Sequence, residues 1–331
     1  MASNLSSTAR RQLLATFATL PFTRAALATQ GQFPQRPLRM VVPYPAGGST
    51  DIVARLVAKA LGELLPGTVV VDNRAGAAGA IGSADVARSA ADGYTLLAHI
   101  VTSAVLTPLF QARTLSYDPV AAFQPVALVA KLPNVLVVRK DLPVRNLAEL
   151  AQWLRAHPAQ ASYGTGGTGS IMHLTGEMLR RQAGLEMTHV PYKGAAPAMQ
   201  DLLGGNLAAV LDNITGVIGA VRAGSVRALG VSTEQRSMAL PDVPTMQEQG
   251  LAGFSNSSWF GIFTRAGCPP EVLSRLEQAT LQACGQSSVR EQLSELGAVV
   301  SPLGSREFMH FWQSEFKYWR QAMAQTPGAA Q

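Results

Sequence analysis

The sequence predicts an α/β fold built from two similar units with a cleft between them. Short apolar strands alternate with glycine turns and helices over residues 38–98, and the same alternation starts again over residues 146–232. Two further apolar stretches, 126–139 and 259–263, have the pattern of extended segments that cross between the units. Alternating strands and helices are typical of a largely parallel sheet covered by helices on both faces.

The first unit is predicted to be a strand–helix–strand–helix–strand arrangement. Its first helix keeps apolar side chains three and four residues apart, which is the spacing of one buried helix face. The expected elements are a strand at 38–42, a helix at 50–65, a strand at 67–71, a helix at 82–90 and a strand at 94–98.

The second unit repeats this pattern, and helices then complete the chain. Its expected helices are 146–157, 170–183, 195–204 and 216–223, and its expected strands are 161–163, 188–192, 208–212 and 226–232. Three more helices are predicted at 270–284, 287–296 and 305–324. The last of these carries an aromatic stripe, which at helical spacing indicates a face that docks in the core.

The restart of the pattern predicts two lobes joined by two crossing segments. Lobe 1 is expected to comprise residues 36–130 and 255–331, and lobe 2 residues 131–254. Ligands of such sheets bind beyond the carboxyl ends of the strands, so the cleft between the lobes is the expected binding site.

The composition is that of a globular protein. The chain has 331 residues, of which 47% are hydrophobic and 15% charged. The formal net charge is +6. Without Arg10, Arg11 and Arg24, 24 basic residues remain against 21 acidic ones, so the net charge of the rest is +3. The remaining basic residues are scattered and do not form a stripe with aromatic ones, so we expect no nucleic-acid partner.

Residues 1–28 have the features of an export signal. Arg10 and Arg11 precede a mostly apolar run, and residues 26–28 match a small-x-small cleavage site. Residues 9–14 are also suggestive of a twin-arginine signal, and a disordered tail is the alternative interpretation. Beyond residue 30, no apolar run approaches the roughly 18–20 residues of a membrane span, so a soluble periplasmic protein is expected.

The two cysteines are predicted to be free, buried thiols. Cys268 and Cys284 stand at opposite ends of the helix expected at 270–284. A helix of this length separates its ends by roughly 20 Å or more, whereas a disulfide needs Cα atoms within about 7 Å. Neither cysteine has an evident histidine partner, so neither is a candidate nucleophile.

Two segments, each made of a strand, a glycine turn and a helix start, are the candidate ligand site. The first spans residues 41–51 and the second residues 163–170. The first N–H groups of a helix lack internal partners and carry partial positive charge, so each segment can hold an anion. Hydroxyl side chains in both segments suit a carboxylate without burying a full positive charge.

Three titratable residues near these segments have a structural and a functional interpretation. Asp51 lies in the first turn of a helix, where it is favourable with the helix dipole whether or not it meets a ligand. His173 either contacts the ligand or is a histidine at the edge of the core. Asp212 ends a strand, where it either receives a ligand amine or hydroxyl or caps the helix that follows.

The second segment also supports a rival hypothesis. Residues 164–169 satisfy the G-x-G-x-x-G pattern of dinucleotide-binding enzymes, and Glu186 lies about 20 residues further on. A purely structural turn is a further alternative, as is a glycosidase pair of Asp51 and Asp212. The five histidines lack metal spacing, and the motifs of common hydrolases and of ATP-binding loops are absent. We therefore expect no enzymatic activity, cofactor or metal.

Several motifs along the chain resemble the Bug family of periplasmic solute receptors, which serve tripartite tricarboxylate transporters. The segments that carry this resemblance run in the same order over nearly all of residues 36–325. They are Val-Pro-Tyr-Pro-Ala-Gly-Gly-Ser-Thr-Asp at 42–51, Val-Asp-Asn-Arg-Ala-Gly-Ala-Ala-Gly at 71–79, Asp-Gly-Tyr-Thr-Leu-Leu at 92–97, residues 163–170 with His173-Leu174, Val-Pro-Tyr-Lys-Gly at 190–194, Leu-Pro-Asp-Val-Pro-Thr at 240–245, Trp-Phe-Gly at 259–261 and Gly-Cys-Pro-Pro at 267–270.

The resemblance implies a two-lobed, type II periplasmic-binding-protein fold with a two-segment hinge. In this family two loops meet across the cleft and hold a ligand carboxylate. The residues expected to contact the ligand are Tyr44, Pro45, Ala46, Gly47, Gly48, Ser49, Thr50 and Asp51 in the first loop, Thr165, Gly166, Gly167, Thr168, Gly169 and Ser170 in the second, and His173 and Asp212 beside them.

The expected function is that of a monomeric periplasmic receptor that delivers a small organic carboxylate to a membrane transporter. A sensory adaptor that passes ligand occupancy to a membrane kinase would have the same fold and cleft. Residues 171–172 and Thr50 differ from common family residues, so the resemblance does not name the ligand.

Overall fold

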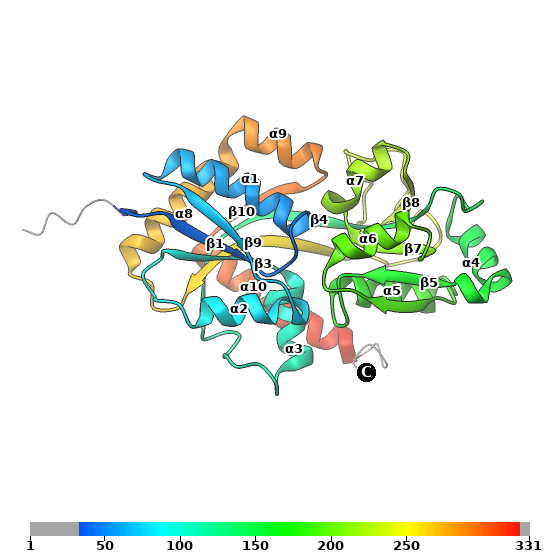
Figure 1. Cartoon of the computed structure of the whole chain (residues 1–331), viewed down its shortest axis with the longest axis horizontal. Coiled ribbons are helices and arrows are strands. Elements are labelled where there is room, and N and C mark those ends of the chain that lie inside the picture. The colour runs from blue at the N-terminus through cyan, green and yellow to red at the C-terminus, as the bar shows by residue number, and fades with distance from the viewer. Residues whose placement is uncertain (1–32, 325–331) are drawn as a thin grey trace, which may run out of the picture. The chain divides into compact units, whose positions relative to one another are not determined.

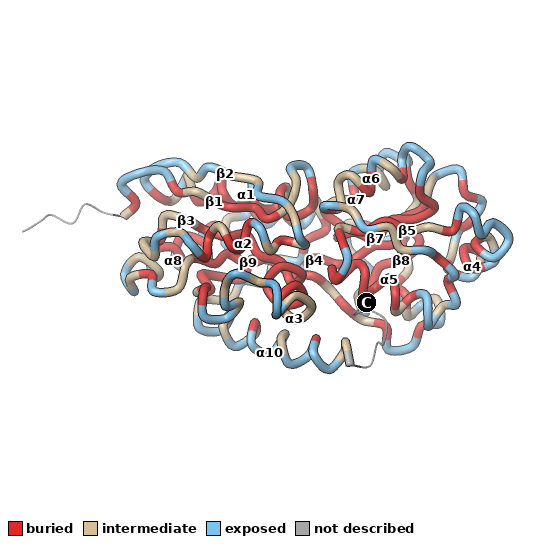
Figure 2. Tube along the Cα trace, turned by 60° about the horizontal axis from the view of Figure 1, so that its bottom comes forward, coloured by how far each residue is buried: buried red, intermediate tan, exposed pale blue. Residues whose placement is uncertain are grey.

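The computed structural model describes residues 33–324, and the export signal predicted at 1–28 lies outside this range. Two groups of strands are joined by long shared strands, and helices flank both groups (Figure 1). The central strands are buried, whereas the outer turns of the helices face solvent (Figure 2). No helix in this part of the chain has the length and apolar character needed to cross a membrane.

The first group begins with the strand–helix alternation that the sequence predicts. Its parallel strands lie in the order β2-β1-β3. The elements are β1 (Leu38–Val42), α1 (Ser49–Leu64), β2 (Val69–Asn73), a 3-10 turn (Ala77–Gly79), α2 (Ala80–Ala87) and β3 (Thr95–Ile100).

The second group has the same construction, with parallel strands in the order β7-β5-β6. Asn146 caps the first of its helices by accepting a hydrogen bond from the N–H of Glu149. The elements are α4 (Leu147–Ala156), a 3-10 turn (Pro158–Gln160), β5 (Ser162–Thr165), α5 (Ile171–Gln182), β6 (Thr188–Pro191), α6 (Ala195–Leu203), β7 (Ala209–Asn213), α7 (Ile214–Arg222) and β8 (Val226–Val231).

Two strands cross between the groups, and one of them is longer than predicted. The apolar runs on either side of residues 131–134 form one continuous strand, β4 (Phe123–Arg139), because residues 131–134 pair with neighbouring strands instead of turning. The first half of β4 pairs with β9 (Ser257–Arg265), and its second half pairs with β7 and β8. The chain therefore passes between the two groups without a flexible turn.

The sheet is mixed and not mostly parallel as the alternation suggested. Parallel pairing holds among β1, β2 and β3 and among β5, β6 and β7, where a helix returns the chain. Every pair that involves β4 or β9 is antiparallel. These strands enter from the opposite group, so no right-handed crossover helix sets their direction.

The C-terminal part covers the first group. Its predicted helices are present as α8 (Pro270–Gly285), α9 (Ser287–Glu295) and α10 (Ser305–Ala324). Besides the two 3-10 turns, three elements were not predicted. They are a π-helical turn (Thr102–Leu106), α3 (Thr107–Gln111) and β10 (Val299–Gly304), an edge strand that pairs with β4. The strand β10 is only partly buried and contains Pro302, so it lacks a clear apolar alternation.

The aromatic stripe of α10 docks against β9, as predicted. Phe308 and Trp312 are fully buried and pack on Phe263, with ring centroids 5.0 and 4.9 Å away. The prediction for the cysteines is also confirmed, because Cys268 and Cys284 are free and buried. Burial raises the pKa of both thiols to about 11, which makes them poor nucleophiles.

Candidate functional site

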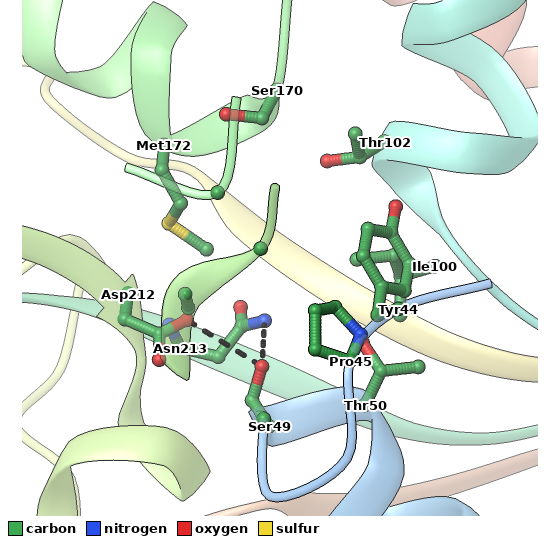
Figure 3. Close-up of a pocket in the computed structure, with 14 residues that line it drawn as sticks. Tyr44, Pro45, Ser49, Thr50, Ile100, Thr102, Ser170, Met172, Asp212 and Asn213 are labelled. Carbon is green, nitrogen blue, oxygen red and sulfur yellow. Dashed lines mark hydrogen bonds between the residues drawn. The ribbon is translucent and has the colours of Figure 1, made fainter. Parts of the chain in front are cut away.

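A pocket lies at the carboxyl ends of strands from both groups, and residues of both predicted loops line it (Figure 3). The cavity has a volume of about 40 Å³. It is lined by Tyr44, Pro45, Gly48, Ser49, Thr50, Ile100, Thr102, Gly166, Ser170, Met172, Gly194, Ala195, Asp212 and Asn213.

Four helix N-termini converge on this pocket. The residues that precede the first turns of α1, α5, α6 and α7 are Gly48, Ser170, Gly194 and Asn213, and all four line the cavity. Each helix follows a parallel strand that ends at the same edge. The free N–H groups and the dipoles of these helices make the pocket electropositive without any cationic side chain.

The first loop brings five of its eight predicted residues to the pocket, and the others support the turn. Gly47 has a φ of +79°, a conformation that glycine adopts without strain, and its N–H donates to Asp51 Oδ2 at 2.9 Å. Ala46, Gly47 and Asp51 are absent from the lining.

Asp51 has a structural role in this loop. Its carboxylate also accepts hydrogen bonds from Arg55 Nε and Asn73 Nδ2, both at 2.9 Å. Burial alone would raise the pKa of Asp51, but the hydrogen bonds from Arg55, Gly47 and Asn73 lower it below the ordinary value. The carboxylate thus ties the loop to the start of α1 and to the end of β2, and a glycosidase pair of Asp51 and Asp212 is not formed across the pocket.

The second loop brings Gly166 and Ser170 to the pocket. Ser170 caps α5 by accepting from the N–H of His173 at 3.2 Å. Gly169 has a φ of +76°, and a Cβ there would lie 2.9 Å from the ring of Phe110. This position therefore requires glycine both for its backbone conformation and for its close packing against Phe110. Thr165, Gly167, Thr168 and Gly169 do not line the cavity.

A pair of histidines supports the second loop from behind. The rings of His173 and His189 stack with centroids 4.2 Å apart. The Nδ1 atom of His173 accepts from the N–H of Gly169 at 3.2 Å, and Nε2 of His189 lies 2.7 Å from Oγ1 of Thr165. Burial lowers the pKa of both, that of His189 to about 4, so both rings are neutral near pH 7. The structure therefore gives His173 a supporting position outside the pocket lining.

The two loops make direct contact with the opposite group of strands. The hydroxyl of Ser49 donates to Asp212 Oδ1 at 3.4 Å and accepts from Asn213 Nδ2 at 3.2 Å (dashed lines in Figure 3). On the other side of the pocket, the N–H of Ile171 donates to Thr102 Oγ1 at 3.2 Å. These contacts hold both walls of the pocket together.

Asp212 is a buried carboxyl group in the wall of the pocket. Its side chain is 4% exposed, and Oδ1 accepts from the N–H of Asn213 at 2.7 Å in addition to Ser49. Burial raises the pKa of Asp212 to about 7, although the hydrogen bonds from Asn213 and Ser49 lower it in part. Asn213, the residue before the first turn of α7, makes no capping hydrogen bond with its side chain. A Cβ on Gly216, in that first turn, would clash with Oδ2 of Asp212, so the carboxyl group lies against the start of α7 as well as in the wall of the pocket.

Six lining residues were not predicted. Gly194 and Ala195 follow β6 in a third strand–glycine–helix turn, and Asn213 follows Asp212 at the end of β7, so the rule that placed the first two loops also points to them. Ile100 and Thr102 sit where β3 passes into the π-helical turn, which has no clear sequence signal. The remaining residue is Met172, in the first turn of α5.

The geometry of the second loop does not favour the dinucleotide alternative. Among the described residues, no group of three or more His, Cys, Asp or Glu side chains could hold a metal ion. In the G-x-G-x-x-G segment, a Cβ on Gly164 would lie 2.6 Å from Leu207, so this glycine is required by packing inside the lobe.

Comparison with known proteins shows the family. Residues 53–326 match the sequence profile of the tripartite tricarboxylate transporter family receptors. BugT of Bordetella pertussis is 35% identical over 305 residues, which are 91% of this chain and 93% of BugT.

Two similar solved structures contain carboxylates. Rpa4515 of R. palustris, solved with adipate, has a TM-score of 0.84 and 34% identity, and the match covers 90% of this chain and 98% of that one. MatC of Rhodopseudomonas palustris, solved with bound malate, has a TM-score of 0.80 and 32% identity, with 88% and 99% covered. These relatives are binding receptors and not enzymes. The chain belongs to the family of tripartite tricarboxylate transporter receptors, which are two-lobed periplasmic solute-binding proteins that include the Bug proteins.

Proposed function

We propose that this protein binds a small organic carboxylate in the pocket of Figure 3 and delivers it to a tripartite tricarboxylate-type membrane transporter. The observation that carries the proposal is the convergence of four helix N-termini on one cavity. Unpaired N–H groups there can donate to carboxylate oxygens, and the dipoles favour a negative charge.

The similar structures with adipate and malate support a carboxylate as the ligand. The first loop (44–51) and the second loop (165–170) are the proposed clamp, and Gly48, Ser49, Thr50, Gly166 and Ser170 are its members that line the cavity. His173 supports the second loop, and Asp212 contributes a polar wall.

Ligand capture requires the two lobes to move. The proposed lobes are residues 36–130 with 255–331 and residues 131–254, which hinge about β4 and β9. A cavity of about 40 Å³ holds only a few water molecules, so a ligand reaches it by opening of the cleft. Closure then lets the ligand bridge loops of both lobes, which stabilises the closed state.

The proposed location is the periplasm, which the family and the N-terminal sequence support. Residues 1–28 are proposed to be an export signal that is removed after transport to the periplasm. A mature protein that begins after residue 28 in the periplasmic fraction would support this assignment, and an uncleaved cytoplasmic protein would contradict it.

Thermal unfolding in the presence of organic acids tests the proposal. A ligand that binds only the folded protein stabilises it by RT ln(1 + [L]/Kd), so at least one acid in a panel should raise the melting temperature. The matched control is the neutral diamide of each diacid, such as adipamide for adipate, which should have no effect. Stabilisation by NAD without stabilisation by any carboxylate would overturn the receptor function.

A pair of glycine variants locates the site. Gly48 lines the pocket, and its negative φ of −78° accepts a side chain, so Gly48→Leu should fill the cavity and abolish ligand-induced stabilisation. Gly219 lies on α7 away from the lining, and a Cβ there would meet no atom within 4 Å, so Gly219→Leu should still bind. Equal binding by both variants would rule out this pocket.

A further inference from the structure

We propose that the ligand is a monocarboxylate that also carries a hydrogen-bond donor, a hydroxyl or an ammonium group, and that this donor faces Asp212 and Asn213. The inference rests on the proposed function, because it assumes that the carboxylate end lies against the helix N-termini. It goes further by assigning the chemistry of the other end of the ligand and by excluding a diacid as the preferred one.

The charge of the lining is the first observation. Of the described residues that line the pocket, Asp212 alone has a formally charged side chain, and no Lys, Arg or His is among them. In Figure 3 its carboxyl group lies on the wall formed by α7 and β7, beside Asn213 and Ser49. A second carboxylate on the ligand would meet an acidic group there instead of a cation.

The second observation is an unpaired acceptor beside this carboxyl group. Asn213 is 1% exposed, and its Oδ1 atom has no hydrogen-bond partner among the described residues. The hydroxyl of Ser49 donates to Asp212, so it faces Asn213 as an acceptor and takes a hydrogen bond from Nδ2. This network directs Oδ1 away from Ser49, and Figure 3 shows the amide between Met172 and Pro45.

Buried acceptors of this kind require a donor. A buried polar atom without a partner destabilises the protein, and a donor on the ligand would remove that cost. The ionised carboxylate of Asp212 and the side-chain amide oxygen of Asn213 are both acceptors, and both side chains meet at the hydroxyl of Ser49. A hydroxyl or ammonium group satisfies both, whereas a methyl group satisfies neither and a carboxylate repels one.

The helices divide the pocket into two chemically different ends. Asp212 places a negative charge directly before α7 and offsets the dipole of that helix. The first turns of α5 and α6 have no acidic residue, so their dipoles favour the ligand carboxylate. In α5 the N–H groups of Ile171 and His173 already donate to Thr102 and Ser170, so the dipole acts there more than free donors do. Ile100 and Met172 supply apolar surface in the same lining, which suits a short aliphatic chain between the two ends.

Matched acids of equal length test this assignment by calorimetric titration at pH 8, above the pKa of about 7 of Asp212, so that its carboxyl group is ionised. The four-carbon set is butyrate, 4-hydroxybutyrate, 4-aminobutyrate and succinate, and the six-carbon set replaces these with hexanoate, its 6-hydroxy and 6-amino derivatives, and adipate. Lactate, alanine, malate and aspartate place the donor beside the carboxylate. The tightest acid should be a donor-bearing monocarboxylate that binds at least tenfold more tightly than the diacid and the unsubstituted acid of its length.

Two variants test whether Asp212 causes the preference for a donor-bearing acid. Asp212→Asn should lower the affinity for the donor-bearing acid at least tenfold, because the negative charge is lost. The ratio of this affinity to the affinity for the diacid should also become smaller. Asp242→Asn is the matched control, since Asp242 is exposed and lies outside the pocket, and it should leave the ratio unchanged. The ligand ranking on the unmodified protein decides the question even if Asp212→Asn does not fold.

The outcomes separate this inference from the proposed function. A diacid that binds as tightly as the best donor-bearing acid would overturn the inference and leave the carboxylate receptor intact. An unchanged ligand ratio in a folded Asp212→Asn variant would also overturn it. Failure of every carboxylate to bind would instead overturn the proposed function itself.

Discussion

A Cβ atom on Gly194 would lie 2.5 Å from Cδ of Pro45, so the turn before α6 packs directly against the loop between β1 and α1. These two residues belong to opposite groups of strands, and both line the pocket. The backbone of Gly194 therefore sets how closely the walls of the pocket can approach.

Gly194→Ala is expected to hold the pocket open. The added methyl group has no room beside Pro45, so closure around a ligand should be hindered and its affinity should fall at least tenfold. Gly67→Ala is the matched control, because Gly67 has a similar φ of +121° against +130°, and the nearest atom to its Cβ is 3.9 Å away. Both variants should lose about 1 kcal/mol of stability to backbone strain, but only Gly194→Ala should lose affinity in calorimetric titration.

A second close approach between the groups lies at Gly297 and Ile214. A Cβ on Gly297 would be 2.6 Å from Cδ1 of Ile214, which is fully buried at the start of α7. The methyl group of Gly297→Ala would collide with Ile214, so this variant should hinder closure and weaken ligand binding, although Gly297 lies outside the pocket lining. Ile214→Ala in the same chain removes the colliding side chain and should restore part of the lost affinity. Gly267→Ala controls for backbone strain, since its φ is +88° and the nearest atom is 3.6 Å away. Additive effects in this double-mutant cycle would show that the contact does not govern closure.

Removal of the Asp51 charge is expected to loosen the first loop. The carboxylate is 2% exposed and accepts from Gly47, Arg55 and Asn73, so Asp51→Asn should cost about 2 kcal/mol of unfolding free energy. Asp141→Asn removes an exposed partner of Arg139 and should cost less than about 1 kcal/mol. Denaturant titration of both variants checks the difference, and equal losses would contradict a structural role for Asp51.

The sequence predicts the parallel units well because their patterns are local. The helix α1 keeps one apolar face, Asn146 supplies a cap, and Pro270 begins a helix, so each signal lies within a few residues of the element that it defines. The strand β10 and the antiparallel pairing of β4 depend on partners far along the chain. No local pattern encodes them.

The sequence predicts where the pocket lies but not all of the residues that line it. Glycine turns after strands located the pocket walls at Gly48 and Gly166, and a third such turn at Gly194 follows the same rule. Which face of a turn meets the cavity depends on the packing of the lobes. For this reason Asp51 and His173 bind groups outside the cavity, whereas Asn213 and Thr102 reach it.

Acid is expected to destabilise the protein through its buried histidines. Burial lowers the pKa of His99 to about 3 and that of His189 to about 4, and it also lowers the pKa of His173. The unfolded chain then binds more protons below its ordinary histidine pKa of about 6.5, so stability falls as the pH drops from there towards 4.

One histidine variant checks this acid sensitivity. His189→Gln should remove about one of the protons that the chain takes up when it unfolds in acid. The slope of the unfolding free energy against pH should therefore decrease by up to about 1.4 kcal/mol per pH unit. His310→Gln is the control, because His310 is exposed, and it should change the slope less than His189→Gln does. Parallel stability–pH curves for the two variants would contradict the assignment to His189.

Asp212 is expected to act in the opposite direction. Its pKa of about 7 in the folded protein exceeds the ordinary aspartate value, so the native state binds the extra proton between these two pH values. The contribution of Asp212 to stability is therefore fully present below about pH 4 and is lost as the pH rises through 7. Asp212→Asn cannot titrate, so its unfolding free energy should fall more steeply on acidification from pH 7 to 5 than that of the unmodified protein. An unchanged slope in guanidinium titrations without ligand would show that Asp212 is ionised throughout this range.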